Sequence, residues 1–120
     1  MKPLFEGSAF GSITIDGATY NHDIIIRLHG SIGKRKKKLS KAVYGTSHIV
    51  SKDEAKHVYD RNAEKIIVGT GHNGILKLSD EASAFFEKRG CKVEACPTPK
   101  AVKRWNEVSG NVIALFHVTC

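Results

Sequence analysis

The sequence contains little that would place it outside ordinary globular domains. It has only three prolines and three cysteines among 120 residues. No apolar run approaches the roughly 18 residues of a membrane-spanning helix, and no basic start followed by a long apolar stretch marks a signal peptide. A hydrophobic content of 41% is typical of a folded chain rather than a disordered one. We therefore expect one soluble domain, residues 1–120, in the cytoplasm.

The cysteines are odd in number and form no Cys-x-x-Cys pair, so a disulfide framework is not expected. Buried, reduced thiols are the simpler interpretation. Cys96 precedes a predicted helix start, where a helix dipole could lower its pKa, and His48 or His72 could act as its base. No spacing requires that arrangement, and a buried position at a strand end fits Cys96 better.

Metal ligands are also sparse. A zinc site would have to combine His117 and Cys120 with a distant residue such as Cys96, and a lone His-x-x-Cys is weak support for zinc. His117 alternates with apolar neighbours, which favours a place on one face of a strand. We expect neither a metal nor a cofactor.

Acidic residues are fewer than basic ones, 12 against 19, and the formal net charge is +7. Most of the excess lies in one basic patch: Lys34, Arg35, Lys36, Lys37, Lys38 and Lys41. Because Leu39 is its one apolar residue and no aromatic interrupts it, we expect an exposed connection or an edge strand guarded by lysines. Such a run would attract nucleic acid weakly, with strong salt dependence and no base reading.

Strand signals dominate the first part of the chain. Residues 11–20 alternate around Asp16-Gly17, a pair that favours a type I′ turn, and so predict a β-hairpin. Residues 24–28 begin with three isoleucines, which indicates a strand covered on both faces.

Capping residues mark three helices further along. Ser51 is the expected N-cap of a capping box in which Glu54 reaches back, Ser79 caps the second helix, and Thr98, followed by proline, caps the third. Strands are predicted at residues 64–68, 91–95 and 112–118. Right-handed crossovers would place these strands in one parallel or mixed sheet, with Trp105 buried beneath the third helix.

The first of these strands ends in Gly69-Thr70-Gly71-His72-Asn73-Gly74, which matches G-x-G-x-x-G, with Glu94 near the position of a ribose-binding acid. A dinucleotide site would need a helix to open within the motif, but residues 75–78 intervene before Ser79. Two alternatives remain open. The backbone N–H groups of the glycine turn and the Thr98 helix start could bind a small anion, or the glycines could simply make a turn.

The chain resembles the Mth-domain family of small archaeal and bacterial proteins of unknown function. Its eukaryotic relatives include the adipogenesis-associated Mth-domain protein and a mitochondrial complex I assembly factor. The residues that carry the resemblance are Tyr44-Gly45-Thr46-Ser47-His48, Gly69-Thr70-Gly71, Pro97-Thr98 with Ala101 and Asn106, and Phe116-His117-Val118-Thr119-Cys120.

The resemblance implies an α/β fold: a three-layer domain with a mixed central sheet, helices packed on it and a small N-terminal β-hairpin layer. It implies no established activity. The assembly role of the mitochondrial relative favours a binding module for a protein partner. The alternative is a small anionic metabolite or nucleotide held, with or without catalysis, at the glycine-turn crevice. The candidate residues for either are Tyr44, Thr46, His48, Gly69, Thr70, Gly71, His72 and Thr98.

Overall fold

The computed structural model describes residues 2–119. Within this range the strands are β1 (Phe5–Ala9), β2 (Ser12–Ile15), β3 (Ala18–Tyr20), β4 (Ile24–Ile26), β5 (Ile32–Lys34), β6 (Ile49–Val50), β7 (Lys65–Thr70), β8 (Lys77–Leu78), β9 (Lys92–Cys96) and β10 (Val112–His117). The helices are α1 (Lys38–Tyr44), α2 (Lys52–Val58), α3 (Asp80–Lys88) and α4 (Thr98–Glu107). None of the described helices is long and apolar enough to cross a bilayer.

The central sheet is mixed and has the strand order β5-β4-β10-β7-β9. β10 lies in its middle, parallel to β7 and antiparallel to β4, while β7 is parallel to β9. Every residue of β10 is buried, because the strand is covered on both faces of the sheet. Its nearly continuous apolar sequence suits burial on both faces. The prediction that residues 64–68, 91–95 and 112–118 share one sheet is confirmed.

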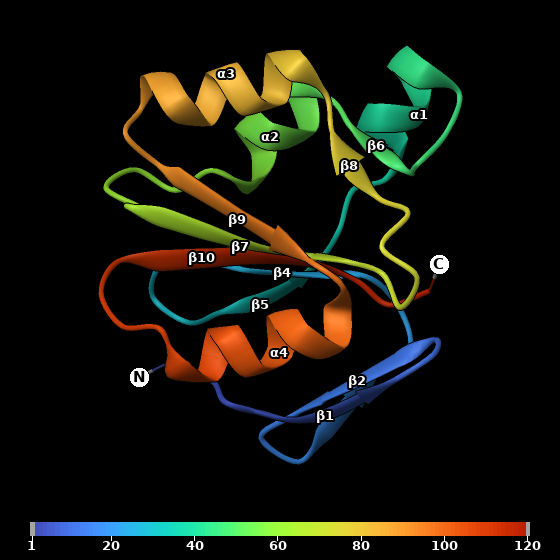
Figure 1. Cartoon of the computed structure of the whole chain (residues 1–120), viewed down its shortest axis with the longest axis vertical. Coiled ribbons are helices and arrows are strands. Elements are labelled where there is room, and N and C mark those ends of the chain that lie inside the picture. Colours follow the sequence, from blue (N-terminus) through green and yellow to red (C-terminus); the bar gives the residue numbers. More distant parts are fainter. Residues whose placement is uncertain (1, 120) are drawn as a thin grey trace.

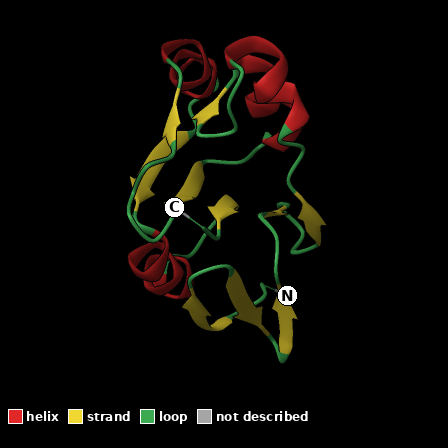
Figure 2. Cartoon of the chain, turned by 90° about the vertical axis from the view of Figure 1, so that its right-hand side faces the viewer, coloured by secondary structure: helices red, strands yellow, loops and turns green. Residues whose placement is uncertain are grey.

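Helices cover both faces of this sheet. Figure 1 shows α2 and α3 above it and α4 below it, beside the small antiparallel sheet β1-β2-β3, and Figure 2 shows the same layers from the side. Alternate residues of one strand enter different cores: Ile66 and Val68 pack with α2 and α3, whereas Ile67 packs with α4. The expected three-layer α/β domain is therefore confirmed.

The N-terminal layer has one strand more than the sequence indicated. The turn of the predicted hairpin is confirmed, since Asp16 and Gly17 have φ values of 48° and 84°, as a type I′ turn requires. β1 was missed because a bulge beside Gly7 disturbs its alternation. Its Phe5 packs against the rings of Trp105 and Phe116 and fastens this layer to α4 and β10.

Two of the three expected caps are confirmed. The hydroxyls of Ser51 and Ser79 accept the N–H groups of Glu54 and Ala82. Two details were wrong: the carboxylate of Glu54 does not reach back to Ser51 but binds Arg35, and Thr98 is the first residue of α4 rather than its N-cap.

The basic patch was only partly predicted. Lys34 ends β5, an edge strand as expected, but after residues 35–37 the patch continues into the helix α1 instead of an extended connection. α1 lacks a side-chain cap, and its one buried residue is Ser40, so its start carries no capping signal and its apolar residues do not mark a core-facing side. It ends at Gly45, whose φ of 70° suits glycine.

Trp105 provides the test of this packing. Its side chain is buried, and its Nε1 donates a hydrogen bond to the carbonyl of Pro3 at 2.8 Å. We expect Trp105→Ala to lower the free energy of unfolding by about 3–5 kcal/mol, because it leaves a cavity and an unpaired carbonyl. Urea unfolding followed by circular dichroism would measure the loss, and a loss below about 1 kcal/mol would contradict the burial of α4.

Candidate functional site

The expected site lies where β7 and β9 end and the chain enters the glycine turn. There the N–H of Gly71 donates to Thr98 Oγ1 at 2.9 Å, and the N–H of Thr98 donates to the Gly71 carbonyl at 3.0 Å. Thr98 Oγ1 in turn donates to the carbonyl of His117 at 2.6 Å. These three bonds join the ends of β7, α4 and β10.

Gly69 is required by this packing. A Cβ atom added there would lie 2.6 Å from the ring of Phe116 and 3.0 Å from Thr98 Oγ1. The glycine therefore permits a close approach of strand and helix. Gly71 has a φ of 98° and shapes the turn itself.

The anion nest expected at the glycine turn is therefore wrong in its central feature. The N–H of Gly71 donates to the Thr98 hydroxyl, and the N–H of Thr98 donates to the Gly71 carbonyl. The N–H of His72 donates to the carbonyl of Thr119. An anion would have to displace these bonds. These bonds favour the second of the two alternatives, a structural turn, and ligand binding at the turn stays a prediction.

The remaining candidate residues fall around the end of β10. The β6–β8 pairing brings the segment before α2 to the glycine turn, and the ring of His48 lies 5.6 Å from that of His117. Thr46 Oγ1 accepts the N–H of His48, and Tyr44 is exposed on α1. The ring of His72 lies 5.9 Å from that of Phe10. Binding by these side chains stays a prediction.

Arg35, expected on a solvated surface, is buried. Its Nε and Nη2 donate to the two carboxylate oxygens of Glu54 at 2.5 and 3.0 Å, its Nη1 donates to Asp23 at 2.9 Å, and Nη2 also reaches the carbonyl of Ser47. Exposure of this residue is 3%. Arg35 therefore leaves the predicted basic patch, because the structure uses its fork of donors between two carboxylates.

Asp23 is the second buried member of the network. One carboxylate oxygen accepts the N–H of Val118 at 2.9 Å, and the other lies 2.7 Å from His117 Nδ1 and also accepts from Arg35. Burial alone would raise the pKa of Asp23, but these bonds outweigh it and hold the pKa well below its usual value. Asp23 therefore stays ionised inside the protein.

Glu54 completes the network on the side of the helices. Its carboxylate accepts from the hydroxyl of Ser40 as well as from Arg35, and Ser40 Oγ accepts the N–H of Ser51 at 2.9 Å. We use the name ion network for the five buried residues Asp23, Arg35, Ser40, Glu54 and His117. It joins the start of β4, the end of β5, both helices α1 and α2, and the end of β10.

A cavity of about 640 Å³ opens outside the ion network. We call it the lysine pocket, and it is lined by Asn21, His22, Asp23, Lys34, Arg35, Lys36, Lys37, Lys38, Val118 and Thr119. The Nζ of Lys37 lies 3.7 Å from the carboxylate of Asp23, with its side chain 39% exposed. Four lysines thus line a hollow whose wall also contains the paired side chains of Asp23 and Arg35.

Neither Cys91 nor Cys96, the two cysteines among the described residues, lines this pocket. Burial is the main cause of a raised pKa for Cys91, to about 11, and for Cys96. A raised pKa depletes the thiolate, so it does not support activation of Cys96 by the start of α4, the arrangement that the sequence did not favour. No group of metal-ligating side chains occurs within residues 2–119, and Cys120 lies outside the described residues.

A three-layer α/β domain with a buried ion network behind a lysine-lined hollow is the class of protein that these observations define. Residues 5–117 match the family described as "Protein of unknown function (DUF498/DUF598)", and the chain belongs to this family. The resemblance to Mth-domain proteins is thereby confirmed. The family description assigns no activity.

Solved structures agree with this assignment. The conserved hypothetical protein PH1505 from Pyrococcus horikoshii OT3 is 36% identical over 100% of both chains, with a TM-score of 0.91. The protein named MT938 is 33% identical over 99% of this chain and 100% of its own, with a TM-score of 0.85. A Bordetella pertussis protein described as a Mth938-like domain is 15% identical over 97% of this chain and 85% of its own, with a TM-score of 0.63, and shows the fold alone.

Asp23 and His117 were missed as a pair in the sequence. They are 94 positions apart, and each lies next to apolar strand residues that explain its local pattern. The available signal was the charge itself, since an acid directly before three buried isoleucines needs a partner. The sequence does not say which of its many basic residues that partner is.

The ion network predicts acid sensitivity. A depressed folded-state pKa of Asp23 contributes stability above the unfolded-state pKa of about 4, and that contribution is lost as the pH falls further. Asp23→Asn should cost about 3–5 kcal/mol at pH 7, because Arg35 loses a buried counter-charge. Between pH 7 and pH 3 the difference from wild type should shrink by about 1 kcal/mol.

The measurement is urea unfolding at both pH values, with Asp80→Asn as the control. Asp80 is exposed in the first turn of α3, so its loss should cost less than about 1 kcal/mol. Equal costs for the two substitutions would mean that Asp23 is not an ionised, paired group.

Proposed function

We propose that the protein is a binding module that holds a small anionic ligand, of the phosphate or carboxylate class, in the lysine pocket. The observation that carries the proposal is that Lys34, Lys36, Lys37 and Lys38 all line one cavity. Like charges held together repel each other, and a bound anion relieves that repulsion. Lysine ammonium groups are suited to phosphate and carboxylate oxygens as point charges.

The ion network supports this assignment by fixing the backbone that carries the lysines. Arg35 lies between them in the sequence, with its guanidinium group held by Asp23 and Glu54 and its N–H donating to the carbonyl of Asp23 at 3.0 Å. Its neighbours Lys34 and Lys36 are exposed. A buried arginine between exposed lysines keeps the cationic side chains on the solvent side of one rigid segment.

Position in the fold also favours this site. In open α/β sheets, ligands bind beyond the carboxyl ends of the strands. The ends of β7 and β9 are closed by the Gly71–Thr98 bonds, whereas Val118 and Thr119, which follow β10, line the lysine pocket. We therefore propose the end of β10, instead of the glycine turn, as the place of the anionic ligand that the sequence offered as the alternative.

A protein partner remains the second candidate. Val43 and Tyr44 are large apolar side chains on α1, exposed by 56% and 36%, and the same helix carries Lys38 and Lys41. An acidic partner surface with an apolar centre would complement them. We also propose a cytoplasmic location, which the free thiols of Cys91 and Cys96 support.

The pocket is tested by titration calorimetry with inorganic phosphate, pyrophosphate and citrate at low and high salt. We expect saturable binding that weakens with salt, because the lysines are exposed. Lys37→Gln should weaken binding about tenfold or more, since the Lys37 ammonium lies 3.7 Å from Asp23 in the pocket wall. Thermal unfolding adds a second readout, because a ligand at 100 times its dissociation constant stabilises by about 2.7 kcal/mol.

Lys52→Gln is the matched control, an exposed lysine on α2 outside the pocket. If Lys37→Gln and Lys52→Gln leave the affinity unchanged, or lower it equally, the anions are attracted by the net charge of the protein and not by the lysine pocket. Either result would contradict the proposal. Binding of labelled single-stranded and duplex oligonucleotides, but of none of the three anions, would support the weak nucleic-acid contact expected from the sequence and contradict the small-ligand proposal.

A further inference from the structure

β9 is an exposed edge of the central sheet. The strand order places β7 on one side of it and no described strand on the other. The opposite edge, β5, is three residues long and adjoins the lysines of the basic patch, whereas β9 has five residues. A longer edge strand with unpaired backbone groups is a template for pairing with another strand.

The open backbone groups of β9 belong to Val93 and Ala95. The N–H of Lys92 donates to the carbonyl of Glu64 on the β7 side at 2.9 Å. In a parallel ladder the direction of these groups alternates, so Glu94 and Cys96 also face β7 while Val93 and Ala95 face outward. No described residue accepts from or donates to these outward groups.

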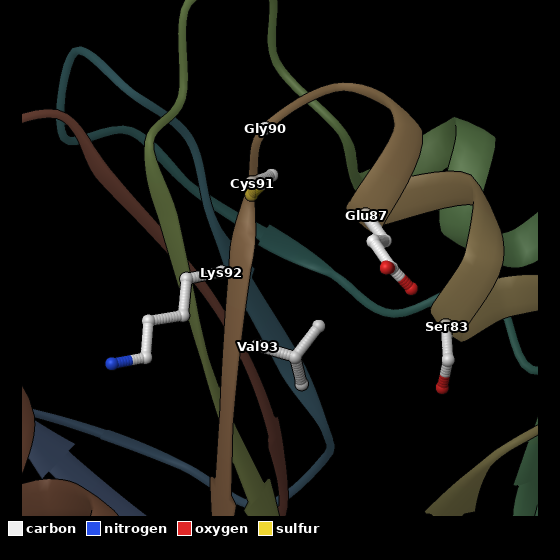
Figure 3. A pocket seen from close by; sticks show the side chains of 6 residues that line it. All are labelled: Ser83, Glu87, Gly90, Cys91, Lys92 and Val93. Atoms are coloured by element: carbon white, nitrogen blue, oxygen red, sulfur yellow. The ribbon is translucent and has the colours of Figure 1, made fainter.

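A hollow of about 450 Å³ lies beside the same edge, between β9 and α3. It is lined by Ser83, Glu87, Gly90, Cys91, Lys92 and Val93. Figure 3 shows the side chain of Val93 directed towards α3, with Ser83 and Glu87 across the gap, while Lys92 points the opposite way. The edge therefore has an apolar, hollowed side under α3 and a charged side under α4.

We propose that this edge pairs with β9 of a second copy of the chain, antiparallel and with Val93 opposite Val93. This register places Lys92 of each copy opposite Glu94 of the other, on the α4 side where Glu94 already meets Arg104. Opposite charges directly across an antiparallel pair are stabilising, and this arrangement occurs twice about the two-fold axis.

The neighbouring registers are less favourable. Centring the pair on Glu94 would place two carboxylates opposite each other. Centring it on Ala95 would set Val93 opposite Pro97, which has no N–H to donate, and would set Glu94 opposite Cys96, so that both Lys92–Glu94 pairs are lost. The Val93 register also lacks one donor, because Ala95 then lies opposite Cys91, whose N–H donates to the carbonyl of Phe86 at 3.0 Å. The charge pairs therefore decide between these two registers. In the Val93 register both valines enter the hollows beside α3, and the two central sheets become one continuous sheet.

Sedimentation equilibrium of the full chain across a hundredfold concentration range tests the pairing. We expect the mass to rise from one chain to two. Lys92→Glu should weaken the dimer about tenfold or more, because it creates two like-charge pairs. Lys52→Glu, the same charge change on α2, should leave the dissociation constant unchanged.

A mixing experiment tests the register itself. Lys92→Glu and Glu94→Lys should each weaken the homodimer, but an equimolar mixture of the two variants should form a heterodimer with both charge pairs restored. Recovery in the mixture also shows that the Glu94→Lys chain is folded. Failure to recover, with both variants folded by circular dichroism, would overturn the register.

Amide hydrogen exchange gives an independent readout on the wild type. The amides of Val93 and Ala95 should become protected as concentration rises, whereas those of Glu94 and Cys96 should be protected throughout. A wild-type chain that stays monomeric across the range, with unprotected Val93 and Ala95 amides, would overturn the proposal that β9 pairs with a second copy. This test is independent of the lysine pocket, so either proposal can fail alone.

Discussion

The burial of Arg35 between Asp23 and Glu54 is the interaction on which the arrangement of this domain depends. Removing three charges from water is costly, and the cost is offset only because every oxygen and nitrogen that faces inward has a partner. The network links the start of β4, the end of β5, α2 and the end of β10, which the hydrophobic cores also join, and it adds α1, which has no residue in either core. Removing one charged member would leave an unpaired charge in the interior and lower the free energy of unfolding. The network therefore favours keeping these segments in one fixed arrangement.

This constraint also explains where the open site lies. Apolar packing is not directional, so the cores alone do not determine where an open site lies. At the glycine turn the strand and the helix pack closely, with Gly69 and Thr98 in contact. Outside the ion network a cavity remains, and the lysines that directly flank Arg35, Lys34 and Lys36, are exposed. Repulsion between their charges opposes closer packing there. Arg35, which is bonded to the interior carboxylates, thus also lines the lysine pocket at the end of β10.

Much of the fold could be predicted from the sequence because its signals are local. Serine caps, the Asp16-Gly17 turn and the apolar runs of β7 and β10 each act within a few residues, and the crossover rule assembles them into one sheet. The site could not be predicted in the same way. A run of basic residues looks solvated wherever it occurs, and only partners distant in the chain distinguish the buried Arg35 from its exposed neighbours. Thr98 was misassigned for a similar reason: its hydroxyl suits an N-cap, but the carbonyl of His117 competes for it.

The central claim is that Arg35 is a buried, fully bonded cation, and nuclear magnetic resonance of guanidinium groups measures this directly. Arg104 is the internal control, because it also binds a glutamate but has a side chain 36% exposed, against 0% for Arg35. At neutral pH the Nε–H of Arg35 should give a resolved signal that exchanges with water at least about a hundredfold more slowly than that of Arg104. Equal exchange rates for the two groups would contradict the account.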